Sequence, residues 1–202
     1  MKTVTAIVEQ KKDKKRVNVY LDGEFCCGMD LFTVMSERIK VGTEIDEKRL
    51  EEVVAKSEYS SALDKALGYI SKTMRTKVQL ITYLKGKNYD GKTIAKVIDK
   101  LFEYGYVDDE LYAKRFAAEK KLSKGKRAIA YELKIKGVDE KTIDKVMDEA
   151  AEEDEGCMRV AVKYLKGREP DFETRGKCYR YLLSKGFSYD TAKETLDKIK
   201  KD

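Results

Sequence analysis

The sequence has 202 residues, of which 40% are charged and 42% hydrophobic, with a formal net charge of +6, 13 glycines and one proline. This composition is typical of amphipathic helices in a chain long enough to bury a core. The weak positive charge is compatible with a polyanionic partner but does not by itself indicate one. The absence of histidine excludes Ser-His-Asp and Cys-His catalytic sets.

The lengths of the apolar runs and the spacing of the cysteines further limit the class of protein. No run of 18 apolar residues exists, and the N-terminus shows no secretory signal, so we expect a cytoplasmic protein without a membrane span. Cys26, Cys27, Cys157 and Cys178 form no C-x-x-C pair. We therefore expect reduced structural thiols, with no metal, cofactor or catalytic residue.

Residues 3–29 have the period of strands. Apolar and polar positions alternate around Val4–Val8 and again around Val17–Leu21. Asp22-Gly23 is a strong signal for a type I′ hairpin. We predict an antiparallel sheet of about three strands, a short helix over about 31–39, and a second helix start at Asp46, which is flanked by Ile45 and Leu50.

From there on, an internal repeat dominates the sequence. LKGKNYDGKTIAKVI (84–98), LKIKGVDEKTIDKVM (133–147) and LLSKGFSYDTAKETL (182–196) align, with Leu84, Leu133 and Leu182 at a constant spacing of 49 residues. A fixed period of this length indicates repeated supersecondary units. Asp90, Asp139 and Ser188 lie at equivalent positions and are good helix N-caps, and Asp108 opens the second unit in the same way.

Each unit is predicted to hold three helices: 61–72, 75–86 and 91–104; 108–122, 125–136 and 140–151; 155–166, 172–184 and 189–200. The fold class is therefore mainly α, with three tandem helix-turn-helix-like repeats in an elongated curved array after a small sheet and helix. The expected divisions are 1–58, 59–107, 108–154 and 155–202.

One stretch matches a phosphate-binding loop. Residues 86–93, GKNYDGKT, fit the G-x-x-x-x-G-K-T pattern, which requires a buried strand before it and a helix after it. The equivalent segments of the other repeats lack Gly-Lys-Thr, and YELKIKG and RYLLSKG read as helices. We therefore predict that Gly86 ends a helix and that Asp90 begins the next one.

Charge separates within the second repeat. Residues 114–136 carry a net charge of +7, and residues 139–155 carry −7. Lys124, Lys126 and Arg127 cluster at a predicted helix start, where cations oppose the helix dipole. The pattern fits either solvated helix faces or a binding face. Tyr104, Tyr106, Tyr112 and Tyr131 are expected to be core or half-buried; stacking with a single nucleic-acid strand is the alternative.

Three stretches resemble the RecX regulators of RecA. These are Arg75-Thr76-x-x-Gln79-Leu80-x-x-x-Leu84, LFEYGYVDDELYAKRF (101–116) and KGKRAIAYELKIKGV (124–138). The hairpin YLDGEF and its following helix are similar to the N-terminal extension of longer members. Gln79 stands where the family usually has Glu, and Asn88 where it usually has Gly.

The resemblance implies a monomeric, non-enzymatic regulator that docks in the groove of the RecA filament on single-stranded DNA. Such a protein bridges protomers and damps ATP hydrolysis, strand exchange and co-protease activity; family members also bind DNA. We expect no small-molecule substrate. The leading candidates for RecA or DNA contacts are Arg115, Lys124, Lys126, Arg127, Lys134 and Lys136. The alternatives are a DNA-binding module of helix-turn-helix-like units and an NTPase that uses residues 86–93.

Overall fold

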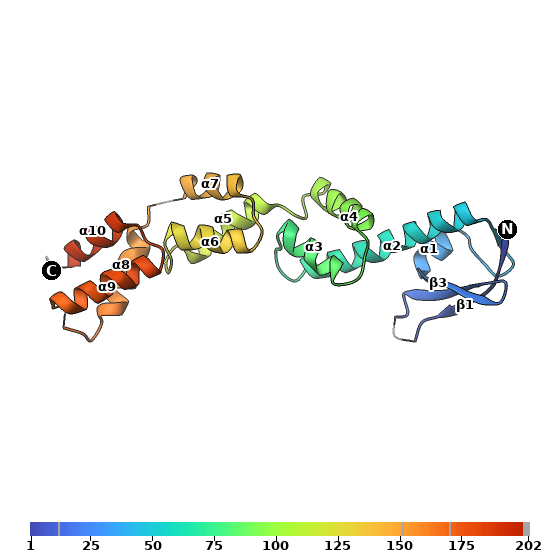
Figure 1. Ribbon diagram of the computed structural model, residues 1–202, viewed down its shortest axis with the longest axis horizontal. Helices are drawn as coiled ribbons and strands as arrows, with labels where there is room; N and C mark the ends of the chain where they lie inside the picture. The colour runs from blue at the N-terminus through green and yellow to red at the C-terminus, as the bar shows by residue number, and fades with distance from the viewer. Residues whose placement is uncertain (12, 151, 170, 200–202) are drawn as a thin grey trace. The chain divides into compact units, whose positions relative to one another are not determined.

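The computed structural model describes residues 1–11, 13–150, 152–169 and 171–199. This part of the chain contains ten α-helices and four β-strands, which confirms the mainly helical class with a small antiparallel sheet (Figure 1). The chain forms two compact units. One comprises Met1–Met74 and Leu80–Val107, and the other comprises Arg75–Gln79 and the chain from Asp108 onwards. The elongated arrangement of the repeats stays a prediction.

The N-terminal sheet has the strand order β3-β2-β1-β4 and is antiparallel throughout. Asp22 (φ 50°) and Gly23 (φ 86°) both have positive φ, which confirms the predicted hairpin turn. The fourth strand was not predicted, because two residues are too short to show alternation. The strands are β1 (Lys2–Glu9), β2 (Arg16–Leu21), β3 (Glu24–Asp30) and β4 (Glu44–Ile45).

Two helices, α1 (Leu31–Ser36) and α2 (Glu47–Ile70), pack against this sheet (Figure 1). The Asp46 carboxylate accepts the backbone N–H of Arg49 at 2.8 Å, which confirms the predicted start of α2. The prediction of a separate helix over 61–72 was wrong, because α2 runs without a break to Ile70. The predicted division between residues 58 and 59 therefore falls inside this helix.

Serine hydroxyls explain why α2 continues through a polar stretch. The Ser57 hydroxyl accepts the backbone N–H of Asp30 at 2.5 Å, and the Ser61 hydroxyl accepts the Arg16 guanidinium at 2.9 Å. Both serines are buried. These two serines therefore attach α2 to the sheet.

Eight further helices follow, and each repeat is a three-helix group in which α2 supplies the first helix of repeat one. Leu84, Leu133 and Leu182 are all fully buried, as the 49-residue period predicts. The helices are α3 (Lys77–Lys85), α4 (Gly91–Glu103), α5 (Asp109–Lys120), α6 (Lys126–Ile135), α7 (Glu140–Glu149), α8 (Asp154–Leu165), α9 (Phe172–Ser184) and α10 (Tyr189–Ile199).

The turn before the third helix is built alike in the three repeats. Asp90, Asp139 and Ser188 each accept the backbone N–H three residues later, at 3.0–3.1 Å, as predicted. Two residues before each cap the chain adopts positive φ, at Asn88 (63°), Gly137 (82°) and Gly186 (87°). Asn tolerates this region better than other non-glycine residues, which accounts for the departure at Asn88. Helix α3 ends at Lys85, directly before Gly86, as predicted; the positive φ of the turn lies at Asn88.

The expectation of buried tyrosines was wrong at three of four positions. Tyr104, Tyr106 and Tyr131 are 60%, 62% and 66% exposed, whereas Tyr112 is half-buried as expected. Tyr104 and Tyr106 flank Gly105 in the turn after α4, and Tyr131 lies on the outer side of α6. The innermost residues of α2 and α5 are the alanines Ala62, Ala66, Ala113 and Ala117. Each lies next to a position that the 49-residue repeat predicted to be apolar, namely Leu63, Leu67, Tyr112 and Phe116.

Two glycines allow the backbones of repeats two and three to approach each other closely. A Cβ atom on Gly156 would lie 2.1 Å from the carbonyl oxygen of Lys121, and one on Gly125 would lie 2.3 Å from the backbone of Gly186. The Gly125 N–H donates to the carbonyl of Lys185 at 3.0 Å. Glu153 links the two repeats as well, because its carboxylate accepts the backbone N–H groups of Lys126 and Ser188.

Similar contacts occur 49 residues earlier in the chain. The Thr76 hydroxyl donates to the carbonyl of Lys136 at 2.6 Å, as Gly125 does to Lys185. The N–H of Lys77 donates to the Asp109 carboxylate at 2.8 Å, as Lys126 does to Glu153. Helices α3 and α6 thus both begin with an N–H that donates to a carboxylate at or directly before the first helix of the next three-helix group.

Candidate partner-binding surface of the second repeat

Helix α6 presents a face that the second repeat does not cover. Ile129 and Leu133 are buried against the rest of the repeat. Arg127, Tyr131, Lys134 and Ile135 follow the i, i+4, i+7, i+8 spacing of the opposite side and are all exposed. Tyr131 and Ile135 are 66% and 68% exposed. We call these four residues the α6 face. Arginine and tyrosine are among the residue types that contribute most of the binding energy at protein interfaces.

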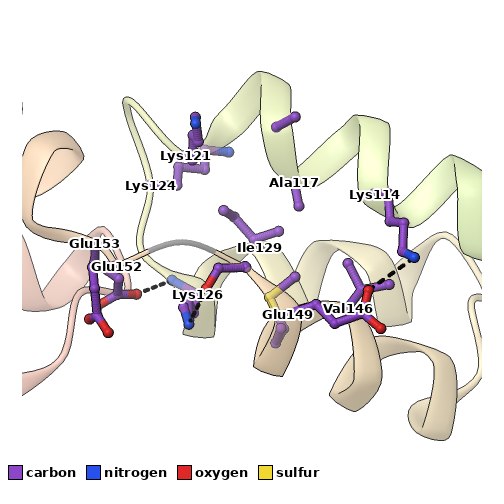
Figure 2. Close-up of a pocket in the computed structure, with 13 residues that line it drawn as sticks. Lys114, Ala117, Lys121, Lys124, Lys126, Ile129, Val146, Glu149, Glu152 and Glu153 are labelled. Carbon is purple, nitrogen blue, oxygen red and sulfur yellow. Dashed lines mark hydrogen bonds and ion pairs between the residues drawn. The ribbon is translucent and has the colours of Figure 1, made fainter.

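A pocket of about 280 Å³ opens between α5, α6 and α7 (Figure 2). Ala117, Ile129, Val146 and Met147 give it an apolar lining. Charged side chains from α5 and the turn after it, from the start of α6, from the end of α7 and from the residues directly before α8 surround this lining in Figure 2. They are Lys114, Lys121, Lys124, Lys126, Glu149, Glu152 and Glu153.

Much of this charge is already paired. Lys114 Nζ lies 2.8 Å from Glu110 and 2.9 Å from Glu149, and Lys126 Nζ donates to the carbonyl of Ala150 at 3.0 Å. Hydrogen bonds from Lys114 and then Lys145 lower the pKa of the Glu110 carboxyl to about 2. Four lysines and three glutamates line the pocket, so its net charge is small. It suits an apolar side chain of a partner better than a small anion.

The six predicted contact residues divide into two groups. Arg115, Arg127 and Lys134 are exposed, and the contact of Lys134 with Glu140 is long, at 3.4 Å. The other three take part in contacts within the second unit: Lys124 pairs with Glu132, Lys126 lies at the junction with repeat three, and Lys136 Nζ lies 5.2 Å from the centre of the Phe116 ring. Their role in partner binding stays a prediction.

A second hollow, of about 680 Å³, lies where the end of α5 and the following turn meet α8 and α9. Its basic residues are Arg159, Lys163, Lys166, Arg168 and Lys185. The sequence does not show them as one cluster, because Lys185 is far from the other four in the chain. The density of basic residues over 159–168 was the available signal. We call these five residues the third-repeat cations.

The Gly86–Thr93 stretch does not form a phosphate loop. The segment before it is helix α3 rather than a strand, as predicted. The backbone N–H groups of Lys92 and Thr93 both donate to the Asp90 carboxylate, at 2.7 Å and 3.0 Å, so these two donors are already engaged. Hydrogen bonds from the Thr93 hydroxyl and backbone lower the pKa of that carboxyl.

Among the described residues, no group of three or more Cys, Asp or Glu side chains is placed to hold a metal ion. None of the helices in this part of the chain is long and apolar enough to cross a membrane. Cys157 and Cys178 are buried in the core of repeat three, and burial raises the pKa of both thiols.

The fold and these surfaces define a tandem three-helix repeat protein whose exposed faces are suited to contacting another macromolecule. Four family models match the chain in order: "Regulatory protein RecX N-terminal domain" at residues 2–46, and the first, second and third three-helix domains of RecX at 62–101, 108–147 and 152–196. The chain belongs to the RecX family.

Relatives agree over nearly the whole length. The regulatory protein RecX of Clostridium tetani is 32% identical, with 97% of this chain and 94% of the relative covered. That of Clostridium beijerinckii is 33% identical, with 98% and 96% covered. A crystal structure of regulatory protein RecX has a TM-score of 0.72 at 26% identity, covering 98% of this chain and all of the other. RecX from Lactobacillus salivarius, at 23% identity over 72% of this chain and 98% of the other, shares the fold with a TM-score of 0.67.

Proposed function

We propose that this protein binds the RecA filament on single-stranded DNA in the cytoplasm and inhibits RecA's ATP hydrolysis, strand exchange and co-protease activity without being an enzyme. Membership of a family whose members are named regulatory proteins supports this proposal. The observation that carries it is the α6 face, where exposed Arg127, Tyr131 and Ile135 have no structural role in the repeat's core.

The α6 face and the neighbouring pocket differ in what they offer a protein partner. Tyr131 supplies a large, half-apolar surface with little rotational freedom to lose on binding. Arg127 and Lys134 supply charge that can steer association and select the partner surface. The apolar lining around Ile129 and Met147 can receive a single protruding side chain. Together they favour docking over catalysis.

The direct experiment is a titration of the DNA-dependent ATPase of RecA with this protein. We expect ATP hydrolysis to fall to a low plateau as the protein is added, at substoichiometric or stoichiometric ratios to RecA. ATPase activity that stays constant across the titration, together with no retention on RecA–DNA filaments in a pull-down, would contradict the proposal.

Charge reversal tests whether the exposed basic residues contact the filament. We expect the triple variant Arg115→Glu, Arg127→Glu, Lys134→Glu to need roughly tenfold more protein for half-inhibition, because reversed charges repel the partner surface. Arg127 and Lys134 make only exposed contacts in this structure, so helicity should be unchanged. A matched control is Lys48→Glu, Lys85→Glu, Lys92→Glu, which changes the same charge on exposed residues of the other unit. Equal inhibition by both triples would place the contact elsewhere.

A second candidate is a duplex-DNA-binding module. It is favoured by the fact that α6, the second helix of a helix-turn-helix-like unit, exposes Arg127, Tyr131 and Lys134 on one side. Binding to naked duplex with a steep salt dependence, and no effect on RecA's ATPase, would select this function over filament regulation.

A further inference from the structure

Two adjacent cysteines of the N-terminal sheet have no part in the proposed function. Cys26 and Cys27 lie in β3, and both side chains are half-buried, whereas Cys157 and Cys178 are fully buried in repeat three. The strand order is β3-β2-β1-β4, so β3 lies at an edge of the described sheet. Cys26 and Cys27 are therefore the cysteines that an ion from solvent can reach.

A β-bulge places these two thiols on the same side of the sheet. In a regular strand, neighbouring side chains point to opposite faces. The partner of Cys27 in β2 is Val19, and the partner of Phe25 is the next residue of β2, Tyr20. Cys26 is therefore an extra residue, the arrangement that defines a bulge. Both cysteines pack against the core cluster that contains Val19, whereas a regular strand would direct only one of them there.

The two thiols also interact with each other. The pKa of the Cys27 thiol is raised to about 12, first by burial and then by a side-chain hydrogen bond with Cys26. The positive charge of Arg16 has the opposite effect and lowers the pKa of the Cys27 thiol. The Arg16 guanidinium is held in place, because it donates to the carbonyl of Gly28 and to the hydroxyl of Ser61, both at 2.9 Å. Two neighbouring sulfur atoms thus lie within the field of a fixed cation.

Covalent geometry disfavours a disulfide between these cysteines. The Cα atoms of neighbouring residues are about 3.8 Å apart across a trans peptide, and disulfides usually join Cα atoms about 4.4–6.8 Å apart. A shared ion needs less contraction. Two sulfur atoms that each lie about 2.3 Å from one ion are about 3.8 Å apart at a tetrahedral angle, and further apart at wider angles. The pair is therefore better placed to hold an ion than to close on itself.

We propose that Cys26 and Cys27 form a binding site for one Cu(I) ion. Soft thiolate ligands favour Cu(I), zinc and iron–sulfur clusters. Zinc takes at least three protein ligands and the clusters take four, and among the described residues no group of three or more Cys, Asp or Glu side chains is placed to hold a metal ion. Cu(I) is satisfied by two sulfur ligands.

The charges of this site balance when the ion is bound. Binding releases both thiol protons to solvent, because the thiolates are the ligands. Two thiolates and one Cu(I) carry one excess negative charge, which the Arg16 guanidinium offsets. The site lies in the compact unit that does not contain the α6 face, so it goes beyond the proposed function.

The test measures transfer of Cu(I) to the full chain from its coloured complex with bicinchoninate, without oxygen and without RecA. We expect the parent chain to withdraw one Cu(I) per molecule, and X-ray absorption at the copper edge to show sulfur ligands. The variant Cys26→Ala, Cys27→Ala retains Cys157 and Cys178. Because these thiols are fully buried, it should withdraw roughly tenfold less Cu(I), or still less, at the same chelator concentration.

A second variant moves one thiol to the other face of the sheet and keeps the number of thiols. Phe25 is 59% exposed, and its ring packs edge-to-face on Tyr20, which lies between the buried core residues Val19 and Leu21 and so points away from the core. In Phe25→Cys, Cys26→Ala, the thiols at positions 25 and 27 therefore lie on opposite faces. We expect its Cu(I) affinity to be roughly tenfold or more below that of the parent chain.

Three outcomes would overturn the proposal. They are parent-like Cu(I) affinity in the double alanine variant, parent-like affinity in the variant with thiols on opposite faces, and no withdrawal of Cu(I) by the parent chain itself. The last of these does not depend on how any variant folds. Because RecA is absent, all three are independent of the ATPase titration.

Discussion

At the scale of single residues, the carboxylate of Asp109 shows two opposing effects. It accepts the backbone N–H of Lys77, which favours the ionised form, but burial disfavours that form. Burial is the larger effect, and the pKa of the Asp109 carboxyl is raised. An acid whose pKa is higher in the folded state binds protons more tightly there, so its contribution to stability is lost as pH rises through that pKa.

We therefore expect Asp109→Asn to be at least as stable as the parent chain at pH 7, because the amide oxygen can still accept the Lys77 N–H without carrying charge. The advantage should shrink as pH falls through the raised pKa of the parent carboxyl, where that group becomes protonated. Asp109→Ala, which removes the acceptor, should lose about 1 kcal/mol. Urea denaturation of the three proteins at pH 4 to 7 measures these differences; an Asn variant as unstable as the Ala variant would contradict them.

Single residues were also the most predictable features. Asp22-Gly23, Asp46, Asp90 and Asp139 act locally, on N–H groups within three residues or through their own φ, so the sequence alone determined their roles. Arg168 and Lys185 could not be placed together in the same way. Their proximity depends on how α8 and α9 pack, and a linear sequence does not display that packing.

At the scale of helices, the fit between repeats two and three depends on Gly156 in α8. We expect Gly156→Ala to destabilise the protein by about 1–3 kcal/mol, because its Cβ would meet the Lys121 carbonyl and the helices must move apart. Gly68→Ala in α2 is the matched control. No atom lies within 4 Å of its added Cβ, and alanine should stabilise that helix by about 0.5–1 kcal/mol. Thermal unfolding of both variants checks the opposite signs.

Helix α2 shows why element boundaries were harder to predict than element types. The predicted boundary between residues 58 and 59 falls in its middle, where Ser57 and Ser61 are buried and bonded to Asp30 and Arg16. Those contacts with the sheet depend on tertiary packing, which a linear sequence does not display. The exposure of Tyr131 was predicted wrongly for a related reason. Helical period places a residue on one side of a helix but does not say whether another element covers that side, and nothing in repeat two covers α6 there.

At the scale of the whole molecule, the two compact units have separate cores. Leu84 is fully buried in one of them and Leu182 in the other. Truncating a buried leucine to alanine costs about 2–5 kcal/mol. We expect Leu84→Ala to raise amide hydrogen exchange mainly in α2 and α4, and Leu182→Ala to raise it mainly in α8 and α10. Equal loss of protection throughout the chain in both variants would show a single cooperative unit instead.

The carboxylates that connect successive repeats are synthesised after the N–H groups whose hydrogen bonds they accept. The first N–H of α6 donates to Glu153, and the N–H of Lys77 donates to Asp109. Neither hydrogen bond can form until the later acceptor residue has left the ribosome. Helix α9 begins differently, because Asp171, directly before it, accepts the N–H of Thr174 at 2.7 Å. A nascent chain halted before Glu153 would therefore carry an open α6 terminus, whereas repeat three completes its own helix start as soon as it emerges.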